Sequence, residues 1–290
     1  MGYGHRVAST KKLFTALTRR GPHKVLRGDL AFAGQPGVLY TPAEGRNLPG
    51  VAFAHDWITS ARRYDGTLEH LASWGIVAAA PNTETGLAPS VLNMAYDLGT
   101  TLDIIAGVRL GEGAISVHPG KLGLVGHGFG GSAAVFAAVG LSSAPHAPKA
   151  VVAAYPTVSS PAAEQPAAGL TVPGLILVDP GDPMSLRSNA VELARAWKPA
   201  TLRATSKTKS GGLVEGRTLA KVVGLPGADR GTQKIVRALM TGYLLHLLAG
   251  DKTYRDFSDA DAELPRAEVM DPFADDPVDL ENKVVALLKP

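Results

Sequence analysis

A glycine-rich turn at residues 126–131, GHGFGG, is the segment with the clearest chemical meaning. It follows a short apolar run at 122–125 and opens a helical stretch at 131–141, so it joins a predicted strand to a predicted helix. Two mechanisms use such a turn. The pattern G-x-G-x-x-G binds a pyrophosphate at the helix N-terminus, whereas G-x-S-x-G presents a serine nucleophile above the sheet. Gly128 stands at the serine position, so the second pattern lacks its reactive oxygen.

A dinucleotide-binding turn needs a further feature that is absent here. An acidic residue should follow about 20 positions later, at the end of the next strand, to hold the ribose. The next predicted strand ends in the sequence AYPT at 154–157, and the first acid after the turn is Glu164. A dinucleotide-binding oxidoreductase is therefore a remote alternative.

Beyond this turn, several segments resemble the α/β-hydrolase superfamily, especially its dienelactone-hydrolase-like and polyester-hydrolase-like branches. The resemblance covers residues 22–250. GHGFGG is similar to the family's Gly-His-Ser-Met-Gly-Gly. The other similar segments are 51–57 (VAFAHDW, the strand and loop that give one oxyanion-hole amide), 68–81 (LEHLASWGIVAAAP), 172–183 (VPGLILVDPGDP, which carries the triad acid) and the closing helix at 243–254.

This resemblance implies a catalytic triad from which two members are missing. The acid maps onto Asp182, but Gly128 replaces the nucleophile. The histidine position falls near Lys207 and Lys209, or within 227–230, and neither place offers an imidazole. Loss of either the serine or the histidine costs about six orders of magnitude in kcat. We therefore expect no catalytic residues, and we expect Gly128→Ser to stay inactive.

A rearranged catalytic site is the main alternative. Ser60 and Ser132 are the candidate replacement nucleophiles, and Lys209 is a candidate base if burial depresses its pKa. The result would be an esterase-type hydrolase. His127 and His246 are predicted to be structural, the first packed in the turn and the second within a leucine-rich helix.

The oxyanion hole of the family that the chain resembles is formed by backbone amides, and these do not depend on the missing side chains. An oxyanion-like pocket bordered by Asp56, Trp57, Phe129 and Tyr155 is therefore expected. Such a pocket could bind a carbonyl or carboxylate ligand without turning it over, or neighbouring side chains could fill it. The leading prediction is a catalytically inactive, hydrolase-like binding or scaffold protein (a pseudoenzyme), for an apolar carbonyl or carboxylate ligand or for a protein partner.

The elements that must position these residues alternate along the chain. Short, continuous apolar runs predict strands that are covered on both faces, as in a parallel sheet. We expect an α/β-hydrolase fold: an α/β protein with a mostly parallel central sheet, helices on both faces and an antiparallel N-terminal edge hairpin at 24–32 and 37–40. Strands are predicted at 51–54, 76–80, 122–125, 151–154, 175–178 and 201–205, and helices at 62–74, 90–109, 131–141, 185–197 and 233–248.

The charge distribution divides the chain into three parts. Residues 1–28 hold seven bases and no acid, whereas residues 251–290 hold eleven acids and five bases. We predict a basic N-terminal arm at 1–21, a hydrolase-like domain at 22–250, and an acidic tail at 251–290 with a short terminal helix at 280–288. The arm and the tail could meet in another copy of the chain, which would favour a homodimer.

Composition excludes several classes of function. A chain that is 45% hydrophobic and 19% charged has a large core and is not disordered, and the absence of cysteine excludes thiolate chemistry. A net charge of +3 gives no reason to expect nucleic acid binding. The histidines lack metal-ligand spacing, so neither a metal nor a cofactor is expected. A cytoplasmic protein is expected, with a peripheral membrane contact as a further partner hypothesis, through Lys11, Lys12, Arg19 and Arg20.

Overall fold

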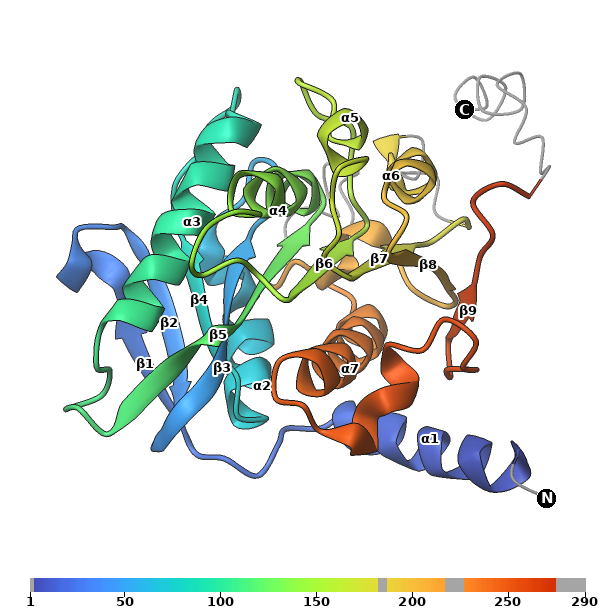
Figure 1. Ribbon diagram of the computed structural model, residues 1–290, viewed down its shortest axis with the longest axis horizontal. Coiled ribbons are helices and arrows are strands. Elements are labelled where there is room, and N and C mark those ends of the chain that lie inside the picture. The colour runs from blue at the N-terminus through green and yellow to red at the C-terminus, as the bar shows by residue number, and fades with distance from the viewer. Residues whose placement is uncertain (1–2, 182–186, 217–226, 275–290) are drawn as a thin grey trace.

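One nine-stranded sheet organises the chain, with helices packed on both of its faces (Figure 1). The computed structural model describes residues 3–181, 187–216 and 227–274. The strand order is β1-β2-β4-β3-β5-β6-β7-β8-β9. The neighbours from β4 through β3 to β8 are parallel, and antiparallel pairs occur only at the two ends of the sheet. The predicted α/β architecture with a mostly parallel sheet is confirmed.

The central strands are buried on both faces, as the continuous apolar runs predicted. Every residue of β4, β6 and β7 is buried, and two apolar layers lie on opposite faces of the sheet. All six predicted strands are present. They are β3 (Gly45–Ala54), β4 (Val77–Pro81), β5 (Ile115–His127), β6 (Ala150–Ala154), β7 (Gly174–Val178) and β8 (Ala200–Thr205).

The N-terminal edge is the expected antiparallel hairpin, formed by β1 (Val25–Asp29) and β2 (Gly37–Pro42). It differs from the prediction in where the first strand ends. The Asp29 carboxylate accepts a hydrogen bond from the Ala31 amide at 2.9 Å and caps a 3₁₀ turn, η1 (Leu30–Ala33). Such local side-chain capping competes with strand pairing, so the chain leaves the sheet before Phe32.

The helices divide into two layers, and Figure 1 shows one above and one below the sheet. Side-chain caps fix two of the helix starts: Ser90 accepts from the Asn93 amide, and Asp229 accepts from the Thr232 amide. One layer holds α3 (Val91–Gly107), α4 (Phe129–Gly140), α5 (Glu164–Ala167) and α6 (Ala190–Ala196), and the other holds α1 (Tyr3–Leu17), α2 (Asp65–Ser73) and α7 (Arg230–Leu247).

The predicted basic arm forms helix α1, which packs against α7. The α1 residues Phe14 and Leu17 are buried in the hydrophobic core. The Thr10 hydroxyl of the same helix donates to Asp256. Phe14 and Leu17, which could have entered a membrane, are thus buried within the protein. The membrane hypothesis is left with the exposed bases Lys11, Lys12, Arg19 and Arg20, and it stays a prediction, as does the homodimer.

Residues after 250, where the sequence placed an acidic tail, extend the sheet. They form a 3₁₀ helix, η6 (Lys252–Phe257), and a short edge strand, β9 (Ala267–Val269), antiparallel to β8. Arg203 on β8 is buried and donates to the carbonyls of Asp259 and Ala262. The predicted helix at 280–288 lies outside the described residues. Within the described ranges, no helix is long and apolar enough to cross a membrane.

Candidate functional site

The glycine-rich turn lies at the carboxyl end of β5, in the middle of the sheet. Gly128 separates β5 from α4 with φ 54° and ψ −120°, a conformation that glycine adopts readily. Its two glycine neighbours are also required. A Cβ on Gly126 would lie 1.9 Å from the Gly130 oxygen, and a Cβ on Gly130 would lie 2.3 Å from the Ala54 oxygen. The turn therefore has the tight geometry that the sequence predicted.

The side chain of Asp56, from the loop after β3, occupies the space above this turn. Its Oδ1 accepts hydrogen bonds from the backbone amides of Trp57 at 2.8 Å and Phe129 at 3.0 Å. A carboxylate at the N-terminus of α4 is stabilised by the amides and the helix dipole. A Cβ added to Gly128 would lie only 2.0 Å from Asp56 Oδ1. The carboxylate thus stands where a side chain at position 128 would have to pass.

Three of the residues expected to border an oxyanion-like pocket lie together, but the chain itself occupies the two backbone amides. Asp56, Trp57 and Phe129 come together as predicted, and we call this arrangement the Asp56 notch. Its two amides, which could have held a carbonyl or carboxylate ligand, instead hold the Asp56 carboxylate. The sequence left an open and a filled pocket as alternatives, and at these two amides the pocket is filled.

Tyr155, the fourth predicted pocket residue, lies beside the turn with its hydroxyl group directed toward Thr205. It follows β6, has φ 52° and is buried. Its hydroxyl and that of Thr205 on β8 are 3.2 Å apart. Its ring packs edge-on against the imidazole of His127. Tyr155 thus packs against His127 beside the turn, with its hydroxyl next to β8.

His127 is engaged through both ring nitrogens. The Ser210 carbonyl can only accept, so His127 Nε2 carries a hydrogen and donates to it at 2.7 Å. In the neutral imidazole, Nδ1 then accepts from the Tyr64 hydroxyl at 2.7 Å. The same hydroxyl accepts from the Asp56 amide at 3.1 Å. The expectation that His127 packs within the turn is confirmed, and the imidazole links the turn to the loop after β8.

The predicted triad positions are only partly within the described structure. Asp182 lies outside the described residues. Lys207 and Lys209 are both exposed, and between them Thr208 is buried and donates from its hydroxyl to Asp179 Oδ2 at 2.7 Å. Sequence reasoning missed this Asp179–Thr208 contact, although the motif VDPGD offers two acids and only the second was selected.

The three alternative catalytic residues have different surroundings. Ser132 is fully buried in α4 and donates to the Thr157 carbonyl at 2.6 Å. Ser60 stands at the N-cap of the 3₁₀ helix η2 (Ala61–Tyr64) without a side-chain cap bond. The Lys209 side chain is exposed, although its amide donates to the Thr232 hydroxyl. None of the three hydrogen-bonds to the Asp56 notch.

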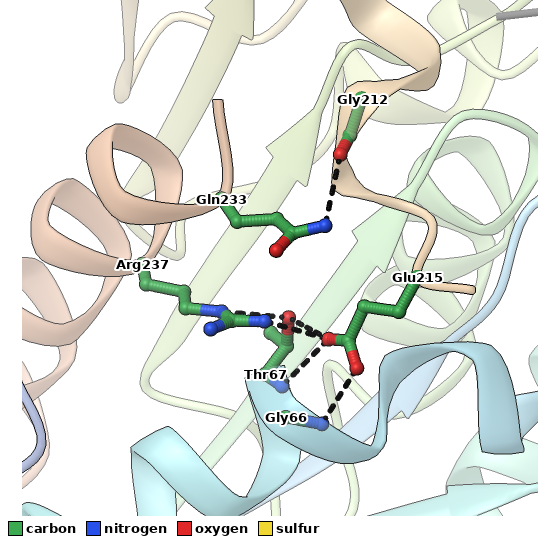
Figure 2. A network of polar contacts seen from close by, with 6 residues as sticks. All are labelled: Gly66, Thr67, Gly212, Glu215, Gln233 and Arg237. Atoms are coloured by element: carbon green, nitrogen blue, oxygen red, sulfur yellow. Dashed lines mark hydrogen bonds and ion pairs between the residues drawn. The ribbon is translucent and has the colours of Figure 1, made fainter. Parts of the chain in front are cut away.

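A partly buried ion pair, which no sequence pattern indicated, fixes the loop that follows the Ser210 contact with His127. Figure 2 shows Glu215 accepting from the Gly66 and Thr67 amides at the start of α2, at 2.8 and 3.0 Å, while Arg237 on α7 donates to it at 2.6 Å. Burial lowers the pKa of Arg237, and the nearby carboxylate of Glu215 counteracts this. Glu215 lies two residues after the 3₁₀ turn η4 (Ser210–Leu213), and Gln233 on α7 donates to the Gly212 carbonyl within that turn at 3.3 Å. The ion pair and this hydrogen bond together attach the loop to α2 and α7.

Strained residues gather where the parallel strands end. Left-handed backbone conformations occur after four neighbouring strands: at Ile58 after β3, Glu84 after β4, Gly128 after β5 and Tyr155 after β6. Each of the three non-glycine residues costs about 1–3 kcal/mol, and such strain is concentrated at functional sites. Ligands of open α/β sheets also bind at the carboxyl ends of the strands. This edge is therefore the candidate functional region.

Comparison with known proteins adds no relative at this point. No family model and no curated protein matches the chain. Within the described ranges, no group of three or more histidine, aspartate or glutamate side chains could hold a metal ion.

Proposed function

We propose that this chain is an α/β-hydrolase-type protein that does not hydrolyse acyl bonds and acts as a binding or scaffold protein. Two features support the fold assignment. The strand order places β4 on one side of β3 and β5 on the other, with β2 antiparallel. A tight strand-to-helix turn follows β5 at the centre of the sheet. The antiparallel N-terminal edge and the turn are features that the sequence resemblance implies.

The Asp56 carboxylate is the observation that carries the functional proposal. Acyl transfer needs a nucleophile, and it needs hydrogen-bond donors aimed at the developing oxyanion. Here position 128 has no side chain, and the donors of Trp57 and Phe129 already hold a charged oxygen. Hydrogen bonds to a charged group contribute about 1.5–3 kcal/mol each. A neutral substrate carbonyl would have to displace a stronger acceptor from both amides.

The same contact bears on the other candidate functions. A pyrophosphate at the N-terminus of α4 would face the Asp56 carboxylate, so the dinucleotide reading is disfavoured by like-charge repulsion. A small carbonyl or carboxylate ligand would compete with Asp56 for the same amides. The rearranged esterase would require Ser60, Ser132 or Lys209 to leave their present positions. Binding of a protein partner at the surface requires none of these changes.

The experiment is a turnover assay with short-chain nitrophenyl esters on the full chain. We expect no release of nitrophenol above buffer for the wild type and for Gly128→Ser. Asp56→Ala, which empties the notch, is expected to be equally inactive because the nucleophile is still missing. Turnover by the wild type that is abolished by Ser132→Ala, Ser60→Ala or Asp182→Ala would overturn the proposal and favour the rearranged enzyme.

A further inference from the structure

Four exposed apolar side chains lie together above the Asp56 notch. Trp57, Ile58, Leu87 and Val158 are 40%, 46%, 78% and 61% exposed. They are connected by specific contacts. The Trp57 indole donates from Nε1 to the Leu87 carbonyl at 3.0 Å, Arg187 Cζ lies 5.8 Å from the centre of the Trp57 ring, and the Val158 amide donates to the Arg187 carbonyl at 2.9 Å. We call these five residues the rim surface.

The rim surface is held in place rather than loosely displayed. Ile58 is β-branched yet has φ 47°, a conformation that is strained for such a side chain. Burial does not account for this strain, because the Ile58 side chain is nearly half exposed. Trp57 is fixed at both ends, by its amide on Asp56 and by its indole on the Leu87 carbonyl. A pre-ordered apolar surface loses less entropy when a partner binds.

The rim surface carries one positive charge, that of the exposed Arg187. Within the described residues, Arg187 makes no ion pair and lies over the face of Trp57. The two carboxylates nearest to the apolar residues in sequence are already occupied by backbone amides. Asp56 accepts from Trp57 and Phe129, and Glu84 accepts from Ser90 at the start of α3. A complementary partner would therefore bring a negative charge together with apolar groups.

We propose that the rim surface docks a polypeptide segment of a partner protein in which an aspartate or glutamate is flanked by aromatic or large aliphatic side chains. The carboxylate pairs with the Arg187 guanidinium, which matches a carboxylate through two parallel hydrogen bonds. The flanking side chains cover Trp57, Ile58 and Leu87. Tryptophan and arginine are the residues that most often dominate binding energy at interfaces. This inference rests on the proposed binding function and names the chemistry of its partner.

A second copy of the chain fits this surface less well. A two-fold contact places the same patch on both subunits, so two positively charged patches would meet, and neither would bring a free carboxylate of the rim surface for Arg187. A lipid surface is also a poorer fit, because a single cation contributes only about 1 kcal/mol toward an anionic membrane.

The test is a selection from a random-peptide library on the immobilised full chain, followed by affinity measurements on a synthetic peptide of the enriched sequence. We expect peptides that place Asp or Glu beside Trp, Phe or Leu. Arg187→Glu and Trp57→Ala should each weaken binding about tenfold or more, which corresponds to about 1.4 kcal/mol. Arg187→Lys should lose less. Tyr96→Ala removes an exposed aromatic side chain on α3 and should leave the affinity unchanged.

Three results would overturn the docking inference. They are failure to enrich any peptide, enrichment of basic sequences, and binding that Arg187→Glu and Trp57→Ala leave intact. The ester assay separates this outcome from the broader proposal. If no peptide is enriched and no ester is cleaved, the docking surface is wrong while the absence of hydrolysis stands. If esters are cleaved, the proposed function itself is wrong.

Discussion

Asp56 Oδ1 lies 3.0 Å from the Phe129 amide nitrogen, and this contact joins the loop after β3 to the first residue of α4. The two residues are 73 positions apart in sequence. The contact places a negative charge at a helix N-terminus, where it is stabilised, and it occupies an amide that a bound acyl group would need. This contact thus stabilises the fold and, together with the hydrogen bond from the Trp57 amide, closes the Asp56 notch.

Removing this carboxylate should destabilise the protein. Asp56→Ala deletes the acceptor for both amides, and we expect the free energy of unfolding to fall by about 1–3 kcal/mol. Asp56→Asn keeps a neutral oxygen acceptor and should lose less. Chemical denaturation monitored by circular dichroism measures both variants. Equal stability of the wild type and Asp56→Ala would show that the contact contributes nothing in solution.

A side chain at position 128 should be incompatible with the Asp56 carboxylate. Gly128→Ser combines a left-handed backbone with a Cβ placed 2.0 Å from Asp56 Oδ1, so we expect a loss of about 2–4 kcal/mol. The matched control is Gly140→Ser at the end of the same helix, where an added Cβ meets nothing within 4 Å. It should cost much less.

The double variant Gly128→Ser/Asp56→Ala isolates the clash between the two positions. If the two side chains compete for one space, the combined loss of stability should be smaller than the sum of the single losses, by about 1 kcal/mol or more. Strict additivity would contradict the proximity of Asp56 and Gly128.

Breaking the partly buried Glu215–Arg237 pair in Figure 2 should loosen the loop that contacts His127. Arg237→Met leaves the Glu215 carboxylate without its cation, and we expect a loss of about 2 kcal/mol or more. Arg20 and Glu69 form an ion pair whose side chains are 57% and 42% exposed. Arg20→Ala is therefore the control, and it should change stability by less than about 0.5 kcal/mol. Similar losses for both variants would argue against the anchoring role of Glu215.

Acid should destabilise the protein through His70 on α2. Burial, with a smaller contribution from Arg237, lowers the pKa of His70 to about 3. Between pH 6.5 and pH 3 the unfolded chain therefore binds a proton that the folded chain does not. The stabilisation is complete above the unfolded pKa and is lost as the pH falls, with a slope approaching about 1.4 kcal/mol per pH unit. Denaturation curves for His70→Gln should show a shallower acid dependence than the wild type, and an unchanged slope would contradict the assignment.

The sheet could be predicted from the sequence because parallel strands that are covered on both faces appear as continuous apolar runs. The five continuous apolar runs and the segment at 201–205 all became strands. Strand β9 was missed because its three residues, Ala267–Val269, are too few to form a recognisable pattern. Their pairing with β8 defines them as a strand. Helix α1 was read as a basic arm because its buried residues, Phe14 and Leu17, are few.

The location of the candidate site could be predicted from the sequence, but the contacts within it could not. Backbone constraints at Gly126 and Gly130 follow from residue type, so the turn could be predicted. That Asp56 closes the notch depends on the side-chain conformation of one residue relative to a helix formed 73 positions later. The inward orientation of Thr208 between two exposed lysines likewise depends on the buried Asp179. Local patterns carry no information about such pairings.

The most direct test of the central claim is the intact mass of the protein after exposure to a fluorophosphonate, which reacts covalently with activated serine nucleophiles. The closed Asp56 notch and the missing side chain at Gly128 predict an unchanged mass for the wild type and for Asp56→Ala. A gain of one phosphonyl group that maps to a serine at the carboxyl edge of the sheet would contradict the claim.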